Sequence, residues 1–198
     1  MLLFGHVGIT VGTVYLVSRL LPAGARRPAV AEKITEGENT LSGSLLSRFF
    51  RNIDYRCLAV GSMLPDIIDK PVGEPLLGNG RIFCHTLFFA IVLILAALVS
   101  FRKKGIVWPS LLAIGTVFHL VLDGMWLDPG TFLWPLYGFA FPRYEIDVSG
   151  WLESMLRAFF TSPAVFISEV VGLAILVFLG VRVIYRKKIM EFLRTGIL

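Results

Sequence analysis

The chain has 198 residues, of which 56% are hydrophobic and 17% charged, and its mean hydropathy is +0.75. This composition is far more apolar than a soluble domain of the same length needs, so we expect an integral membrane protein. Two cysteines, Cys57 and Cys84, are too few for a disulfide framework. Since no linker or low-complexity tract divides the chain, we predict one integral-membrane domain over residues 1–198.

The first half of the chain contains three apolar segments. Residues 1–21 are almost continuously apolar and, as a helix of roughly 30 Å, would match the hydrocarbon thickness of a bilayer. Residues 44–64 predict a helix that begins amphipathically at the membrane interface and turns inward until Pro65. The glycines and prolines of residues 70–80 predict a loop, and residues 82–101 predict the next span.

The second half contains two further spans and an aromatic segment between them. Residues 106–122 are apolar, with Pro109 near the start, where a helix tolerates proline. Residues 124–162 are too broken to span and too aromatic for water, which predicts short helices at the headgroup level. Residues 163–185 form the last membrane helix. The sequence therefore predicts an all-α, polytopic membrane bundle of about five membrane helices with short interfacial helices.

The positive charges predict how these helices are oriented. With the N-terminus outside, the inner side collects 15 of the 19 lysines and arginines, as the positive-inside rule favours. We therefore expect a multi-pass protein of the cell (inner or plasma) membrane, with its C-terminus in the cytoplasm. The surplus of positive charge, +5 overall, lies beside the span ends, so we expect no nucleic-acid partner.

Six side chains that can bind a metal fall at the same, outer end of the predicted helices. His119 and Asp123 are four residues apart and therefore share a helix face. Three imidazoles and three carboxylates form a mixed nitrogen and oxygen set that suits Zn²⁺ first, or Mn²⁺ or Fe²⁺, as one or two ions. The predicted metal ligands are His6, Asp66, Asp69, His85, His119 and Asp123.

Several neighbouring residues are candidates for roles in catalysis. Asp69 or Asp66 is expected to orient or deprotonate a water, and Arg81 to bind an anionic group of the substrate or, alternatively, to anchor its helix at the interface. Glu169 could support the site, or could snorkel or bond to Ser168. Cys84 could be a soft ligand or a small buried residue that only fills space.

The same residues also allow interpretations without a metal. Each histidine could be a core residue bonded to a carbonyl, and all six residues could form a buried hydrogen-bond network. Unpaired charges near hydrocarbon cost about 2.5 to 3.5 kcal/mol each on insertion scales, so six together need pairing or a function. The chain carries no His-Glu-x-x-His, Gly-x-Ser-x-Gly or phosphate-loop motif.

In order and spacing, these motifs resemble the YdjM-like, LexA-regulated inner-membrane proteins. The resemblance covers roughly residues 1–140 and rests on His6, Gly61-Ser62-Met63-Leu64-Pro65-Asp66, Gly80-Arg81-Ile82-Phe83-Cys84-His85-Thr86, His119-Leu120-Val121-Leu122-Asp123 and Trp134-Pro135-Leu136-Tyr137. Gly80 stands where that family has a histidine, Cys84 where it has a threonine, and Asp69 follows Asp66 by three residues instead of two. Losing the histidine removes one possible ligand of a second metal.

The resemblance implies metal-dependent hydrolysis, which is inferred in that family from a motif pattern similar to that of helical zinc phospholipases C. We predict a membrane-bound hydrolase in which metal-activated water attacks an amphiphilic substrate, a phospholipid or another phosphoester or acyl ester. One alternative is a divalent-metal or proton carrier, which usually has a midplane site between repeats; the sequence shows neither feature. The other alternative is a membrane scaffold with a structural metal.

Overall fold

The computed structural model describes residues 2–20, 49–143 and 151–198, and the regular structure in these ranges is all helical, as predicted. The beginning of the predicted 44–64 helix, up to residue 48, lies outside the described residues. The long helices are α1 (Leu3–Leu20), α3 (Tyr55–Leu77), α4 (Leu87–Lys104), α5 (Trp108–Leu122) and α8 (Pro163–Tyr185). The short ones are η3 (Phe83–His85), η4 (Met125–Leu127), α6 (Pro129–Phe132), α7 (Trp151–Thr161) and α9 (Ile189–Thr195).

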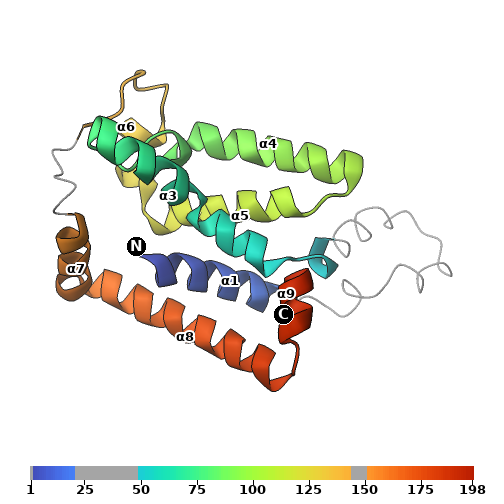
Figure 1. The fold of residues 1–198 in the computed structure, drawn as a ribbon. Helices are drawn as coiled ribbons and strands as arrows, with labels where there is room; N and C mark the ends of the chain where they lie inside the picture. Colours follow the sequence, from blue (N-terminus) through green and yellow to red (C-terminus); the bar gives the residue numbers. More distant parts are fainter. Residues whose placement is uncertain (1, 21–48, 144–150) are drawn as a thin grey trace.

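The long helices lie side by side in the order α8, α1, α3, α5 and α4 (Figure 1). The closest pairings are α3 with α5 and α1 with α8, and α1 also contacts α3 and so joins the two pairs. Helices α1, α4 and α8 run in one direction and α3 and α5 run in the other. Each end of the bundle is therefore built from helix starts and helix ends in alternation.

Glycines allow the two closest pairings. A Cβ added at Gly8 of α1 would collide with the backbone of Gly172 in α8, and one at Gly115 of α5 would lie 2.5 Å from the carbonyl carbon of Gly61 in α3. Small residues at such contacts let helix backbones approach closely, which is a common way of packing helices in membranes. The glycine pairs thus fix the spacing of the helices that carry the polar residues described below.

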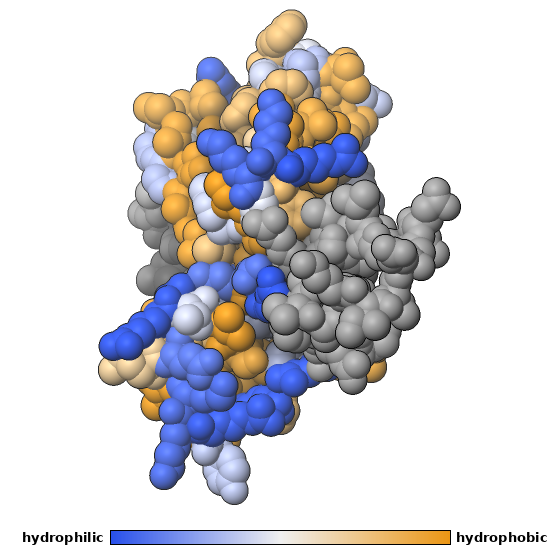
Figure 2. Space-filling model, turned by 90° about the vertical axis from the view of Figure 1, so that its right-hand side faces the viewer, coloured by the Kyte–Doolittle hydropathy of each residue, from blue (hydrophilic) through white to orange (hydrophobic). Residues whose placement is uncertain are grey.

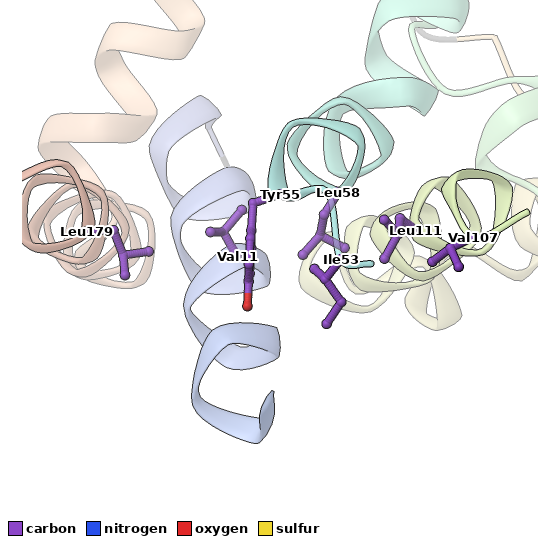
Figure 3. Packing of buried hydrophobic residues seen from close by; sticks show 7 residues of the cluster. All are labelled: Val11, Ile53, Tyr55, Leu58, Val107, Leu111 and Leu179. Carbon is purple, nitrogen blue, oxygen red and sulfur yellow. The ribbon is translucent and has the colours of Figure 1, made fainter. Parts of the chain in front are cut away.

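An apolar core joins four of the long helices. Figure 3 shows the side chains of its seven buried residues in a row across α8, α1, α3 and α5, with the residues just before α3 and just before α5 contributing one each. They are Val11, Ile53, Tyr55, Leu58, Val107, Leu111 and Leu179. A smaller cluster of Ala90, Leu120 and Met125 lies where α4, α5 and η4 meet.

The structure corrects the predicted end of α3. The sequence predicted a helix that stops at Pro65 and a loop at 70–80, but α3 continues through Pro65, Pro71 and Pro75 and ends at Leu77. Each proline removes one hydrogen-bond donor, a loss that membrane helices tolerate when neighbouring groups compensate. The buried face of α3 continues past Pro65 at helical spacing, to Asp69 and Gly73. Tertiary packing therefore outweighs the local proline signal.

Among the described helices, α1 and α8 are long and apolar enough to cross a membrane. Helix α4 has 18 residues but ends in three basic ones, and α5 has 15 residues. Large apolar side chains are nevertheless exposed along both α4 and α8, among them Leu95 on α4 and Phe178 on α8. Extended exposed apolar surface of this kind marks contact with lipid or with another protein, and so supports a membrane location.

The end of the bundle farthest from the start of α1 is basic. Helix α1 ends near Arg19, and α4 and α8 end in the runs 102–104 and 186–188. Figure 2 faces this end and shows hydrophilic residues gathered in several places on it. The opposite end, where α1, α4 and α8 begin, holds the predicted metal ligands.

Candidate metal centre

All six predicted ligands meet at the start of α1. Helix α1 contributes His6 from its first turns, α3 contributes Asp66 and Asp69, and η3 contributes His85. Helix α5 contributes His119 from its last turn and Asp123 as its C-terminal cap. The three histidines are fully buried. The structure thus brings the six residues together at one end of the bundle, and their roles as metal ligands stay predictions.

The neighbour of His119 determines which of its ring nitrogens carries the proton. Its Nδ1 lies 2.7 Å from the backbone carbonyl oxygen of Ser62. Because a carbonyl oxygen can only accept a hydrogen bond, Nδ1 must carry the hydrogen. In a neutral imidazole the other nitrogen, Nε2, then carries no hydrogen and presents a lone pair. The close approach of α3 and α5 at Gly61 and Gly115 brings the Ser62 carbonyl to this ring.

The proton of His85 is placed in the same way, by Asp69. Its Nδ1 lies 2.7 Å from Asp69 Oδ2, and the Asp69 carboxylate also accepts the backbone N–H groups of Ile82, Cys84 and His85 at 2.9 to 3.1 Å. Because the oxygens of Asp69 accept from all of these groups, Nδ1 of His85 is the donor, and in a neutral imidazole its Nε2 then carries a lone pair. A carboxylate behind an imidazole is the usual support of a metal-binding histidine.

The two Nε2 atoms face each other and an oxygen of Asp66. His85 Nε2 lies 3.3 Å from His119 Nε2. Asp66 Oδ1 lies 3.5 Å from the first and 3.7 Å from the second. This oxygen is buried and has no hydrogen-bond partner among the described residues. Three lone-pair acceptors in contact repel one another unless a cation, either a metal ion or an added proton, lies between them.

The spacing of these atoms fits a metal ion. Four ligands that surround a tetrahedral ion at about 2.0 to 2.2 Å lie roughly 3.3 to 3.6 Å from one another. The distances between His85 Nε2, His119 Nε2 and Asp66 Oδ1 are 3.3 to 3.7 Å, and Asp123 Oδ2 lies 3.9 Å from His119 Nε2. The residues present therefore match a divalent ion in both chemistry and spacing.

His6 and Asp123 form the other side of the cluster. The His6 ring stacks on His119 with centroids 4.2 Å apart, and its Nε2 lies 3.0 Å from Asp123 Oδ1. Neither ring nitrogen of His6 makes a hydrogen bond of acceptable geometry within the described part of the chain. His6 also belongs, with Asp66 and His119, to a group whose ligand atoms all lie within 4.8 Å of one another. It is thus placed to complete the ligand set.

Two cations flank the cluster from outside. Lys70 Nζ lies 2.8 Å from Asp66 Oδ2, and the Arg81 guanidinium lies 3.0 Å from Asp123 Oδ2. The sequence interpretation included Arg81 but missed Lys70. The signal for Lys70 was its four-residue spacing from Asp66, which places the two side chains on one face of a helix. It was missed because the helix was predicted to stop at Pro65.

Glu169 has a role that the sequence did not suggest, whereas Cys84 is buried, as one of its two interpretations predicted. The buried Glu169 carboxylate accepts the backbone N–H groups of Leu2, Phe4 and Gly5, at 2.8 to 3.0 Å, and so caps the start of α1 just before His6. The predicted bond to Ser168 is absent, since that hydroxyl donates to the carbonyl of Val165. Cys84 contributes its backbone N–H to Asp69.

Comparison with known proteins identifies the family. The chain matches the family described as YdjM inner membrane protein over residues 1–189, and it belongs to that family, as its motifs predicted. The match extends beyond the motif region and includes the aromatic segment and α8. No curated protein and no solved structure matches the chain.

Proposed function

We propose that this member of the YdjM inner membrane protein family is a membrane-bound, metal-dependent hydrolase that acts on an amphiphilic phosphoester or acyl ester. The observation that carries the proposal is the group formed by His85 Nε2, His119 Nε2 and Asp66 Oδ1, which lie 3.3 to 3.7 Å from one another in a buried site. A buried arrangement of this kind is costly unless it binds a cation.

His85, His119 and Asp66 would hold the ion, with His6 and Asp123 completing the set. The mixed nitrogen and oxygen donors and the tetrahedral spacing favour Zn²⁺ over Mn²⁺ or Fe²⁺. When bound, such an ion makes water ionise near neutral pH and polarises a phosphoryl or acyl oxygen. A carrier is less well supported, since the ligands gather at one end of the bundle instead of near its middle.

The protein's own side chains divide the remaining work. Asp69 has its oxygens engaged by four donors, so we assign it the positioning of His85 in place of metal binding or proton transfer. Asp66 and Asp123 each direct an oxygen toward the histidines and can take a proton from water. Arg81 is half exposed at the edge of the site and keeps donors for an anionic oxygen of the substrate.

We infer that α1, α3, α4, α5 and α8 all cross the membrane, with the metal centre at the outer face. The alternating directions of these helices fit five successive crossings (Figure 1). The basic ends of α1, α4 and α8 lie together, away from the centre, and the positive-inside rule assigns that end to the cytoplasm. The N-terminus would then lie outside and the C-terminus inside.

The experiment is a measurement of bound metal in detergent-purified protein by inductively coupled plasma mass spectrometry. We expect about one equivalent of zinc, manganese or iron, lost in His85→Ala and Asp123→Ala. Asp69→Asn should weaken metal binding by about 10- to 100-fold in competition with a chromophoric chelator, since it disturbs the group that orients His85. Asp54→Asn, at the opposite end of the bundle, is the matched control and should bind metal like the wild type.

Hydrolysis is then measured with bis(p-nitrophenyl) phosphate and with phospholipid vesicles. Metal-dependent cleavage of either, absent in His85→Ala, is the expected result. Bound metal without cleavage would instead identify a structural metal in a membrane scaffold. A wild type that binds no metal even after reconstitution would contradict the hydrolase proposal. The six residues would then be explained as a protonated hydrogen-bond network.

A further inference from the structure

An apolar cavity of about 540 Å³ lies directly beside the metal centre. The start of α1, α3, α7 and α8 form its walls, with Leu3, Met63, Phe159 and Leu173 among the residues that line it. Its volume falls in the range of about 300 to 1,000 Å³ that is usual for small-molecule sites. Figure 1 shows the same four elements around the N-terminus.

Charged groups enter this cavity at three points. Asp66 connects it to the metal centre, because one oxygen faces His85 and His119 and the other pairs with Lys70. The carboxylate of Glu169 is engaged by the backbone of α1. Among the described residues that line the cavity, Lys70, which is partly exposed, is the cation that can meet a ligand, one helical turn from Asp66.

Helix α7 covers the cavity with its apolar side. Leu156 and Phe159 are three residues apart and both line the cavity. Glu153 and Arg157 form an exposed ion pair elsewhere on the same helix, 2.8 Å apart. This two-sided helix lies within the 124–162 segment predicted to lie at the headgroup level, where one side meets water and the other meets apolar material.

We propose that the cavity binds an acyl chain of a glycerophospholipid, with the lipid phosphate between Lys70 and the metal centre. The inference rests on the proposed hydrolase function and names its substrate class. An apolar chain matches the lining, and a phosphate matches a lysine beside a divalent cation. A lipid is also the amphiphile that a protein with this much exposed apolar surface meets at highest concentration.

The test is photocrosslinking with phosphatidylglycerol that carries a diazirine at the end of one acyl chain. It uses the purified protein, both as isolated and after EDTA treatment, and maps the labelled peptides by mass spectrometry. We expect label on peptides that contain Met63, Phe159 or Leu173. Leu173→Trp, which fills the cavity, should reduce this label at least tenfold. Val177→Trp, one turn further along α8 and exposed, should not reduce it.

Unlabelled competitors identify what is recognised. Each buried methylene should strengthen binding about fourfold, so didecanoyl phosphatidylglycerol should displace the probe, whereas chain-free glycerophosphoglycerol and inorganic phosphate should not. Lys70→Gln should weaken the label because the phosphate loses its cation. Label spread evenly over the exposed faces of α4 and α8, and unchanged in Leu173→Trp, would overturn the proposal. Because crosslinking measures lipid binding without turnover, failure of the lipid proposal and failure of the hydrolase proposal can be told apart.

Discussion

The two ends of the bundle both carry many ionisable side chains, yet they hold them in opposite ways. At the metal-centre end, His6, His85 and His119 are fully buried. Backbone groups fix two of these rings, directly through the Ser62 carbonyl and indirectly through Asp69. At the basic end, the side chains of residues 102–104 and 186–188 are exposed. Burying polar groups in fixed positions costs folding free energy at the first end, whereas the charges at the second end stay solvated.

This contrast has a consequence for mutations. A buried polar group whose partner is removed costs its full desolvation energy, while an exposed charge simply returns to water. Equivalent substitutions should therefore cost more at the metal-centre end than at the basic end. Helix α8 runs from one end to the other and offers matched positions for this comparison.

The largest difference is expected between two glycines of α8. Gly172 faces the backbone of Phe4 in α1, so a Leu side chain there would force the two helices apart. Gly180 has open space around it. We expect Gly172→Leu to lose most of its folded protein and Gly180→Leu to keep it, as measured by size-exclusion recovery and thermal unfolding in detergent. Equal recovery of the two variants would contradict the close contact of α1 and α8.

A smaller difference is expected between two glutamates. Glu169→Ala leaves three backbone N–H groups at the start of α1 without their acceptor and should destabilise the protein by about 1 to 3 kcal/mol. Glu191→Ala at the basic end removes only a half-exposed pair with Lys188, which contributes about 0 to 1 kcal/mol. Thermal unfolding of both variants measures the difference. A smaller shift for Glu169→Ala than for Glu191→Ala would show that the cap is not important for stability.

The fold was predictable where hydrophobic length decided it. Residues 163–185 and 106–122 were predicted within two residues of α8 and α5, because continuous apolar runs bounded by proline or basic residues have one simple interpretation. The end of α3 was not predictable, because Pro65, Pro71 and Pro75 signal a break locally. Beyond Pro65, Asp69 accepts backbone N–H groups from residues 82–85 and Gly73 packs against Asn79, contacts that sequence spacing alone does not reveal.

The composition of the site was predictable, but the division of labour within it was not. Rare histidines and aspartates in an apolar chain identified the six residues, since burying them has a large cost. Nothing in the sequence distinguished Asp66, with a free oxygen toward the histidines, from Asp69, whose oxygens are fully engaged. That difference arises from the turn around η3, which directs three backbone N–H groups at one carboxylate.

The smallest effect concerns a carboxylate at the basic end. Asp54 caps α3. The Arg56 guanidinium donates to both oxygens of the Asp54 carboxylate, which lowers the pKa of Asp54 below its usual value of about 4. A depressed folded pKa adds stability above the unfolded pKa, and this stability is lost as the pH falls through the folded value. Asp54→Asn keeps a good helix cap but loses the charge. The melting temperature of the wild type should therefore exceed that of the variant by a small, constant amount above pH 5 and converge with it below pH 4. A difference that persists at low pH would assign the stabilisation to the cap alone and not to the ion pair.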